Sequence, residues 1–176
     1  MKIVNTKING LKIIKTKIYR DKRGFLKEVF RKNVLNSIEF PFDIMSYSKK
    51  NVLRGLHIQR KKPQGKIVSV LKGQIYDVAL DLRKNSSTFG KVFKCILSAK
   101  NSKSIFIPPG FAHGFITMDK ENIVIYSCTK YRDKKSETTI IYNDKNVNIK
   151  WPSKKIIISS KDKKGITFNE YLNKYI

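Results

Sequence analysis

Histidine and cysteine, two residue types that often bind transition metals, are scarce in this sequence of 176 residues, which has two of each. Cys95 and Cys128 lie far apart in strand-like segments and form no CxxC pair. We therefore expect buried free thiols and neither a disulfide nor a cysteine metal site. A histidine this rare is a candidate functional group, and both His57 and His113 sit in distinctive motifs.

Long hydrophobic runs are also absent. No apolar stretch approaches the roughly 18 residues of a membrane span. Residues 1–7 (MKIVNTK) lack the apolar segment of a secretion signal. The sequence therefore predicts a protein that has no membrane partner and resides in the cytoplasm.

Acidic residues are few: 13 Asp and Glu stand against 38 Lys and Arg, which gives a formal net charge of +25. One interpretation is a polyanionic ligand, because a strong positive field concentrates phosphates near a protein. The other is compositional bias, with lysines scattered over solvated faces. The lysines come in dispersed pairs and not in one basic stripe, which does not favour nucleic acid as a partner; such pairs are Lys49-Lys50, Lys61-Lys62, Lys134-Lys135 and Lys154-Lys155.

The length and a hydrophobic content of 40% predict one globular domain spanning residues 1–176. Short β-branched segments, separated by Gly, Pro, Asn or Ser, predict an all-β barrel or sandwich. We expect a hairpin from residues 67–71 and 75–82 around Lys72-Gly73. A C-terminal helix is expected after Thr167, which forms a capping-box pair with Glu170. Further strands are expected at residues 91–97, 104–107, 123–129 and 138–142.

The N-terminal third of the chain is predicted in less detail. Residues 8–18 are typical of one or two edge strands, and a turn at residues 21–24 (DKRG) precedes a strand over residues 25–30. Strand alternation puts Glu28 on the same face as Phe30, which could be the interior face, and Arg23 lies in the preceding turn. Residues 31–37 could form a short helix before Pro41.

The most informative segment is residues 53–59 (LRGLHIQ), followed by residues 64–66 (QGK). A lone His57 in a strand is often only a hydrogen-bonded core or surface residue. Lys66, expected on a neighbouring strand, suggests more: an imidazole can take a proton next to a carbonyl while an ammonium stabilises the oxyanion. Arg54 adds a guanidinium suited to phosphate.

A second motif, residues 108–115 (PPGFAHGF), presents His113 next to a rigid turn. The prolines and Gly110 could simply shape a loop. Alternatively, the two histidine segments fold against each other to line one pocket of a β-barrel. Together they resemble the two signature blocks of cupin barrels, whose metal-binding members use three histidines and a glutamate. With Gln59 at the second histidine position of the first block, we expect no metal.

Separate blocks in order along the chain resemble the dTDP-4-dehydrorhamnose 3,5-epimerase family. The resemblance runs from the turn at residues 21–24 to Asp162, which is all but the two ends of the chain. The blocks are residues 48–59 (SKKNVLRGLHIQ), 64–66 (QGK), 77–83 (DVALDLR), 87–90 (STFG), 107–115 (IPPGFAHGF), 142–144 (YND), 151–152 (WP) and 160–162 (SKD).

The resemblance implies a cupin-type double-stranded β-helix, or jelly-roll barrel, that needs neither a metal nor another cofactor. Such enzymes invert sugar carbons beside a C4 ketone of a nucleotide-linked sugar. By motif, His57 would be the base, Asp162 its dyad partner, and Lys66 the group that holds the C4 enolate oxygen. Tyr126 would return a proton from the opposite face; without the resemblance it would count as an ordinary strand aromatic.

The same resemblance implies which residues bind the substrate. Arg23, Arg54 and His113 would contact the sugar and diphosphate, and Gln59 belongs to the first binding block. Glu28 would contact the nucleotide side, and a homodimer is expected in which this contact could cross the interface.

The chain departs from the family where a Gln and an Asn commonly precede the first block, because Phe42 and Ile44 stand there. Ile58 and Arg132 stand where tyrosines are usual. The nucleotide and the number of inverted carbons therefore stay open. The alternatives are a single-carbon epimerase or ketoisomerase on another nucleotide sugar, and a non-catalytic basic cupin that binds sugar or nucleic acid.

Overall fold

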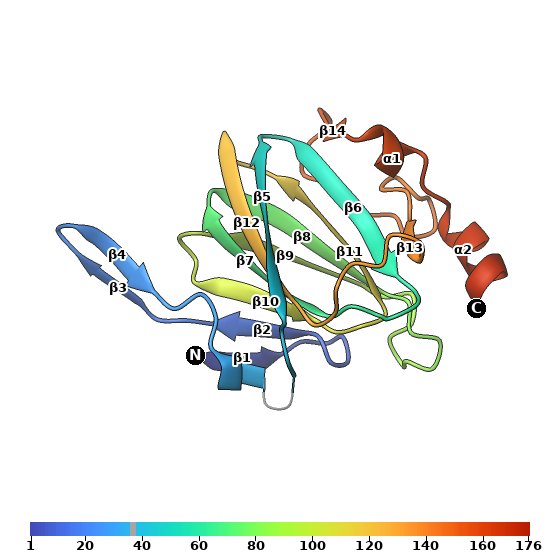
Figure 1. The fold of residues 1–176 in the computed structure, drawn as a ribbon. Helices are drawn as coiled ribbons and strands as arrows, with labels where there is room; N and C mark the ends of the chain where they lie inside the picture. The colour runs from blue at the N-terminus through green and yellow to red at the C-terminus, as the bar shows by residue number, and fades with distance from the viewer. Residues whose placement is uncertain (36–37) are drawn as a thin grey trace.

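The computed structural model describes residues 1–35 and 38–176, and its strands form two large sheets that face each other (Figure 1). The first sheet has the order β1-β2-β10-β7-β12-β5. Its strands are β1 (Lys2–Asn5), β2 (Lys12–Lys15), β10 (Lys103–Ile107), β7 (Lys66–Lys72), β12 (Glu121–Cys128) and β5 (Phe42–Lys49).

The second sheet has the order β13-β6-β11-β8-β9, with β14 paired in parallel to β6. Its strands are β13 (Glu137–Thr139), β6 (Val52–Gln59), β11 (Phe111–Thr117), β8 (Gln74–Asp81), β9 (Val92–Ser98) and β14 (Ile157–Ile158). The all-β prediction is confirmed, and strands lie at each of the four further segments for which they were expected. The expected segment at residues 138–142 yields only the end of β13.

The predicted hairpin at Gly73 is wrong, although both of its strands exist. β7 belongs to the first sheet and β8 to the second, so the chain crosses between sheets at this turn. Gly73 has φ +80°, and a Cβ there would meet the Glu121 carbonyl and the Asn122 side chain. Local turn chemistry resembles that of a hairpin, but the two apolar faces are buried by pairing with strands distant in sequence.

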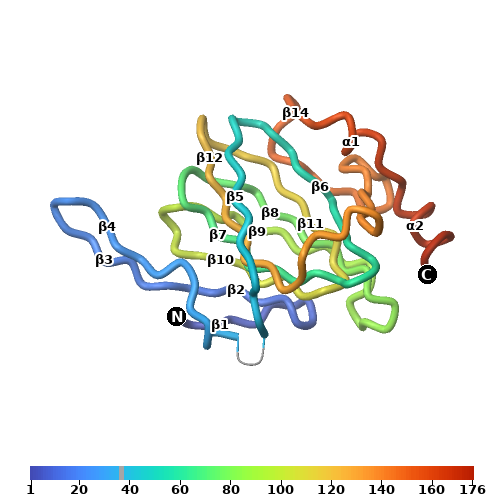
Figure 2. Tube along the Cα trace, in the orientation of Figure 1, coloured from blue at the N-terminus to red at the C-terminus, as the bar shows by residue number. Residues whose placement is uncertain are grey.

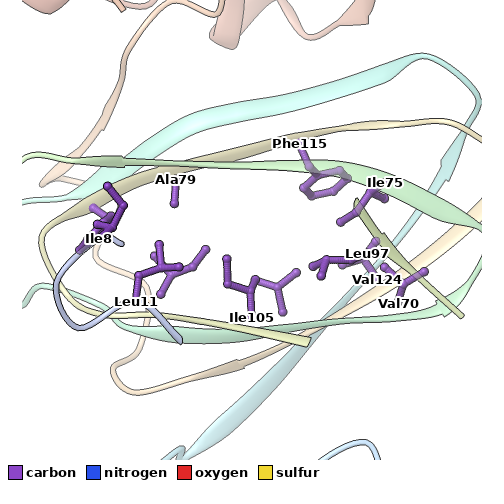
Figure 3. Packing of buried hydrophobic residues seen from close by; sticks show 12 residues of the cluster. Ile8, Leu11, Val70, Ile75, Ala79, Leu97, Ile105, Phe115 and Val124 are labelled. Carbon is purple, nitrogen blue, oxygen red and sulfur yellow. The ribbon is translucent and has the colours of Figure 1, made fainter. Parts of the chain in front are cut away.

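The core fills the space between the sheets. Val70, Ile75, Leu97, Ile105 and Phe115 are each at most 1% exposed and come from five different strands (Figure 3). Sheets packed this way exclude water along most of the interior, which leaves one end available for a site.

The N-terminal segment differs from its prediction. β2 is an interior strand of the first sheet and β1 forms the edge. β3 (Ile18–Asp21) and β4 (Gly24–Lys27) pair into a hairpin that extends away from the two sheets (Figures 1 and 2). β4 ends before Glu28, and Glu28 is exposed instead of interior. A 3₁₀ turn, η1 (Lys32–Leu35), occupies part of the expected short helix; residues 36–37 of that prediction lie outside the described residues.

The C-terminal helix is confirmed as α2 (Phe168–Tyr175). The Thr167 side chain accepts a hydrogen bond from the Glu170 backbone N–H, and the Glu170 side chain accepts one from the Thr167 backbone N–H. A shorter helix, α1 (Ser160–Lys163), was not predicted. Within residues 1–35 and 38–176, no helix has the length and apolar character needed to cross a membrane.

Candidate active site

A cavity of about 620 Å³ opens between the two sheets. One wall comes from β5, β7 and β12 of the first sheet, and the other from β6 and β11 of the second, with β13, β14 and α1 supplying the remainder. Its lining is rich in polar and charged side chains: Ser46, Arg54, His57, Gln59, Gln64, Lys66, His113, Tyr126, Arg132, Glu137, Lys161 and Asp162.

The two histidine motifs do fold against each other. β6 and β11 pair antiparallel with His57 directly opposite His113, and both rings line the cavity. The register shifts just beyond this pair, where Gly55 with φ +109° lies against Gly114. A Cβ on Gly55 would be 2.5 Å from the His113 carbonyl oxygen and 2.6 Å from the Gly114 Cα. Glycine here lets the two backbones approach closely enough to place both imidazoles in one pocket.

Gly55→Ala is therefore expected to lower the free energy of unfolding by about 2–4 kcal/mol, since it combines a backbone clash with an unfavourable φ. Gly24→Ala is the matched control, because Gly24 also has a positive φ but nothing lies within 4 Å of its Cβ position. That variant should cost only about 1 kcal/mol. Urea unfolding of both variants measures the difference, and equal costs would contradict the close-approach argument.

His57 is hydrogen-bonded to a buried carboxylate. Its Nε2 lies 2.7 Å from Asp162 Oδ1, and the other carboxylate oxygen accepts a hydrogen bond from the Gly55 N–H at 3.3 Å. Asp162 sits on α1, whose N-cap Ser159 accepts from the Asp162 N–H. Burial raises the pKa of Asp162, but the hydrogen bonds from His57 and Gly55 and the His57 charge outweigh it and hold the pKa below its usual value. With Nε2 tied to Asp162, Nδ1 is the ring nitrogen left to take a proton from a ligand.

Tyr126 lies on β12, in the sheet opposite His57. Its hydroxyl is 3.2 Å from Ser46 Oγ, and its ring packs edge-on against His113 at 6.5 Å between centroids. Burial, the largest influence, raises the pKa of Tyr126 well above that of a free phenol. The phenol therefore keeps its proton at neutral pH and can act as a donor.

Lys66 extends from the start of β7, which is also in the sheet opposite His57. The expectation that these residues occupy neighbouring strands is wrong: they face each other across the cavity, since β6 and β7 join opposite sheets. Among residues 1–35 and 38–176, no carboxylate forms an ion pair with this ammonium. Burial lowers the pKa of Lys66, and the charges of Cys128, Glu137 and Asp77 oppose that effect. In its protonated form, Lys66 can stabilise an oxyanion that forms in the cavity.

Comparison with known proteins shows the family of the chain. A family model described as dTDP-4-dehydrorhamnose 3,5-epimerase matches residues 5–170. The chain belongs to the dTDP-4-dehydrorhamnose 3,5-epimerase family. Its resemblance to that family, stated from sequence motifs, is thus confirmed.

Relatives of this epimerase family match nearly end to end. The dTDP-4-dehydrorhamnose 3,5-epimerase of Methanothermobacter thermautotrophicus is 43% identical over 169 residues, which cover 92% of this chain and 91% of that protein. The dTDP-4-dehydrorhamnose 3,5-epimerase of Shigella flexneri is 40% identical over 174 residues, which cover 96% of this chain and 96% of that protein. The crystal structure of the Legionella pneumophila dTDP-6-deoxy-D-glucose-3,5-epimerase, in complex with dTDP-4-keto-L-rhamnose, superposes with a TM-score of 0.90 at 43% identity over 96% of this chain and 93% of that chain. The cupin-type fold is confirmed by these structural neighbours.

Arg54 and Gln59, both predicted from the first epimerase motif, line the cavity in different ways. Arg54 donates to Ser48 Oγ at 3.0 Å and to the Tyr47 carbonyl at 3.2 Å. Both N–H groups of the Gln59 amide are used by backbone: Nε2 donates to the carbonyls of Lys62 and Tyr131, and Oε1 accepts from the Asp133 N–H. Gln59 therefore fixes the loop after β12, and a substrate that accepts a hydrogen bond from its Nε2 would have to replace one of these bonds.

Sequence analysis did not predict a cluster of charged groups around Glu137. The Glu137 carboxylate pairs with Arg132 at 2.7 Å and with Lys161. Burial raises its pKa, but the hydrogen bonds from Arg132 and Lys161 dominate and bring the pKa to about 2. The sequence analysis named Arg132 as a departure from a usual tyrosine and placed Lys161 in the SKD block, but it did not connect either residue with Glu137.

Arg23 and Glu28, predicted to bind substrate, are not brought to the cavity of their own chain. Arg23 sits at the tip of the β3–β4 hairpin with its side chain 89% exposed and pairs with Asp21. Glu28 follows β4 and pairs with Arg31.

Of the two thiols, Cys128 is buried and lines the cavity, while Cys95 is half-buried, and both are free.

Proposed function

We propose that this chain inverts C3 and C5 of a nucleotide-linked 4-keto-6-deoxyhexose, converting dTDP-4-dehydro-6-deoxy-D-glucose to dTDP-4-dehydro-L-rhamnose. The observation that carries the proposal is the cavity itself. It holds a carboxylate-paired imidazole on one sheet, and a protonated phenol and the Lys66 amine on the facing sheet. Membership of the epimerase family supports the same reaction.

The chemistry follows from the positions of three groups. His57 Nδ1 takes the proton from the carbon beside the ketone, and Asp162 stabilises the imidazolium. The electron pair moves into the ring as an enolate, whose C4 oxygen carries the negative charge next to Lys66. Tyr126 donates its proton to the other face of the same carbon, so the configuration inverts. The His57 imidazolium then loses its proton to water, and the Tyr126 phenolate gains one, before the second carbon reacts.

The nucleotide diphosphate is the expected ligand of the remaining cationic side chains. Two solved relatives support this: one contains dTDP-4-keto-L-rhamnose, and a Bacillus anthracis epimerase, 37% identical with a TM-score of 0.89 over 94% of this chain and 98% of that chain, contains TDP and pyrophosphate. In this chain Arg54, Arg132 and Lys161 place positive charge in the cavity lining. Guanidinium groups match phosphate oxygens well.

We infer a homodimer from the hairpin formed by β3 and β4. Its apolar side chains face solvent, with Tyr19 56%, Phe25 47% and Leu26 74% exposed, although such groups are usually covered. A dimer formed through this hairpin would let the predicted contact of Glu28 with the nucleotide cross the interface to the partner's cavity.

Leu26→Asp tests the dimer. Light scattering should show a dimer for the unchanged protein and a monomer for the variant, because a buried carboxylate without a partner is costly. Lys154→Asp, at an exposed lysine outside the hairpin, is the control and should remain dimeric. A monomeric unchanged protein would contradict the inference.

The expected cytoplasmic location stays a prediction.

The reaction is tested by incubating the protein with dTDP-4-dehydro-6-deoxy-D-glucose and following ring coupling constants by NMR. Inversion at both C3 and C5 supports the proposal. Inversion at one carbon would favour the single-carbon alternative, and a ketone moved to C3 would favour a ketoisomerase. An unchanged substrate, together with salt-sensitive binding to unrelated DNA, would favour the non-catalytic alternative.

A further inference from the structure

A second imidazole–carboxylate pair lies beside the first. His113 Nε2 is 2.8 Å from Asp77 Oδ2, and the two side chains are 5% and 0% exposed. Because His57 and His113 are cross-strand partners, the two pairs lie side by side, and both histidine rings line the cavity. Only the first has a role in the reaction proposed above, and Asp77 was not among the predicted site residues.

Asp77 is in an environment that does not favour a carboxylate. It lies on β8, between Cys95 on β9 and Phe115 on β11 in the strand register. Its Oδ1 is buried and has no hydrogen-bond partner within the described part of the chain. Such an unpaired oxygen costs about 1–3 kcal/mol, which opposes the stabilisation that the hydrogen bond of Asp77 to His113 provides. Within residues 1–35 and 38–176, His113 is the one group that the Asp77 carboxylate bonds, so the role of this carboxylate lies with that ring.

The second ring nitrogen of His113, Nδ1, belongs to a ring that lines the cavity. Nε2 is occupied by Asp77, and among residues 1–35 and 38–176 no group hydrogen-bonds to Nδ1. The ring lines the cavity and packs against Tyr126, the proposed proton donor. Where Asp77 is ionised, its carboxylate only accepts hydrogen bonds, and the proton between the two groups is on Nε2. The lone pair of a neutral ring is then on Nδ1, where it can accept a hydrogen bond from a ligand.

We propose that Asp77 is a positioning residue: it fixes His113 as the Nε2–H tautomer so that Nδ1 accepts a hydrogen bond from a hydroxyl group of the sugar. This inference rests on the proposed epimerase function for its substrate. Through this hydrogen bond, His113 holds the sugar ring between His57 and Tyr126. A misplacement of about 1 Å can cost about 100-fold in rate, so the tautomer matters although Asp77 itself contacts no substrate.

The tautomer can be measured without any variant. With only two histidines in the chain, ¹⁵N-edited NMR of the imidazole groups gives two sets of ring signals. His113 is expected to have a protonated Nε2 and an unprotonated Nδ1 at neutral pH. A proton on Nδ1 with a bare Nε2 would overturn the inference, whether or not the protein is an epimerase.

Asp77→Asn gives the second test, because its amide can donate to Nε2 and so favour the Nδ1–H tautomer. We expect the His113 signals to change tautomer and kcat to fall about 100-fold. In the His113→Asn background, Asp77→Asn should have an effect of no more than about threefold, since Asp77 acts through the ring. The proposal would be overturned if the effects of Asp77→Asn and His113→Asn on kcat were fully additive. It would also be overturned if Asp77→Asn had the same rate as an active unchanged protein.

Asp81→Asn is the matched control. Asp81 is on the same strand, is also 0% exposed, and is bonded to Arg83, Ser86 and Thr88 away from the cavity lining. Its loss should lower the melting temperature but leave the His113 tautomer unchanged. A tautomer change in this variant too would show a general effect of core damage and would overturn the specific role of Asp77.

Discussion

Replacing His57 by asparagine is expected to abolish deuterium exchange into C3 and C5 of the substrate, with a loss of at least about 1,000-fold in rate. Asparagine is close to histidine in size but has no basic nitrogen, so the proton beside the ketone has no acceptor. Removing one member of a catalytic dyad typically costs this much or more. The measurement is ¹H NMR of the substrate in deuterium oxide.

The matched comparison for this variant is Asp162→Asn. It keeps the shape of the dyad but removes the charge that stabilises the His57 imidazolium. A smaller loss than in His57→Asn is expected, because the base itself remains. If His57→Asn exchanged both hydrogens at the normal rate, His57 would not be the base, and the assignment of the dyad would fail.

Tyr126→Phe is expected to separate the two halves of the reaction. His57 can still remove the proton and return deuterium to the same face, so exchange should continue. Inversion should fall by about 1,000-fold, because the opposite face has lost its donor. NMR of the recovered sugar distinguishes exchange from inversion: in Tyr126→Phe most of the sugar that gains deuterium should keep its configuration, whereas the unchanged protein should also invert it.

Tyr76→Phe controls for the loss of a phenol as such. Tyr76 is half-buried against Trp151, burial also raises its pKa, and it lies outside the cavity lining. This variant should invert both carbons normally. Normal inversion by Tyr126→Phe would exclude Tyr126 as the donor and leave the opposite wall without one.

Much of the fold was predictable because its signals are local. The alternation of apolar residues marks most strands, and the Thr167–Glu170 capping box marks the last helix. Strand partners are not local. Lys72-Gly73 was interpreted as a hairpin turn because nothing in those residues shows that β7 and β8 join different sheets.

The candidate site shows the same limit. The His57 and His113 motifs were predicted to share a pocket, and the register places these residues opposite each other. Glu137 and Asp77 were missed as site residues because their relevance comes from neighbours distant in the chain, Lys161 and His113 respectively. A carboxylate in a strand has no sequence pattern that separates a surface charge from one buried beside a cavity.

The most direct test of the opposed His57 and Tyr126 is the place of deuterium in the product. The unchanged protein, incubated with dTDP-4-dehydro-6-deoxy-D-glucose in deuterium oxide, should give a sugar with deuterium at both C3 and C5 and inverted configuration at each. A product that keeps its original hydrogens at C3 and C5, or no change in the sugar at all, would contradict proton transfer between two facing walls.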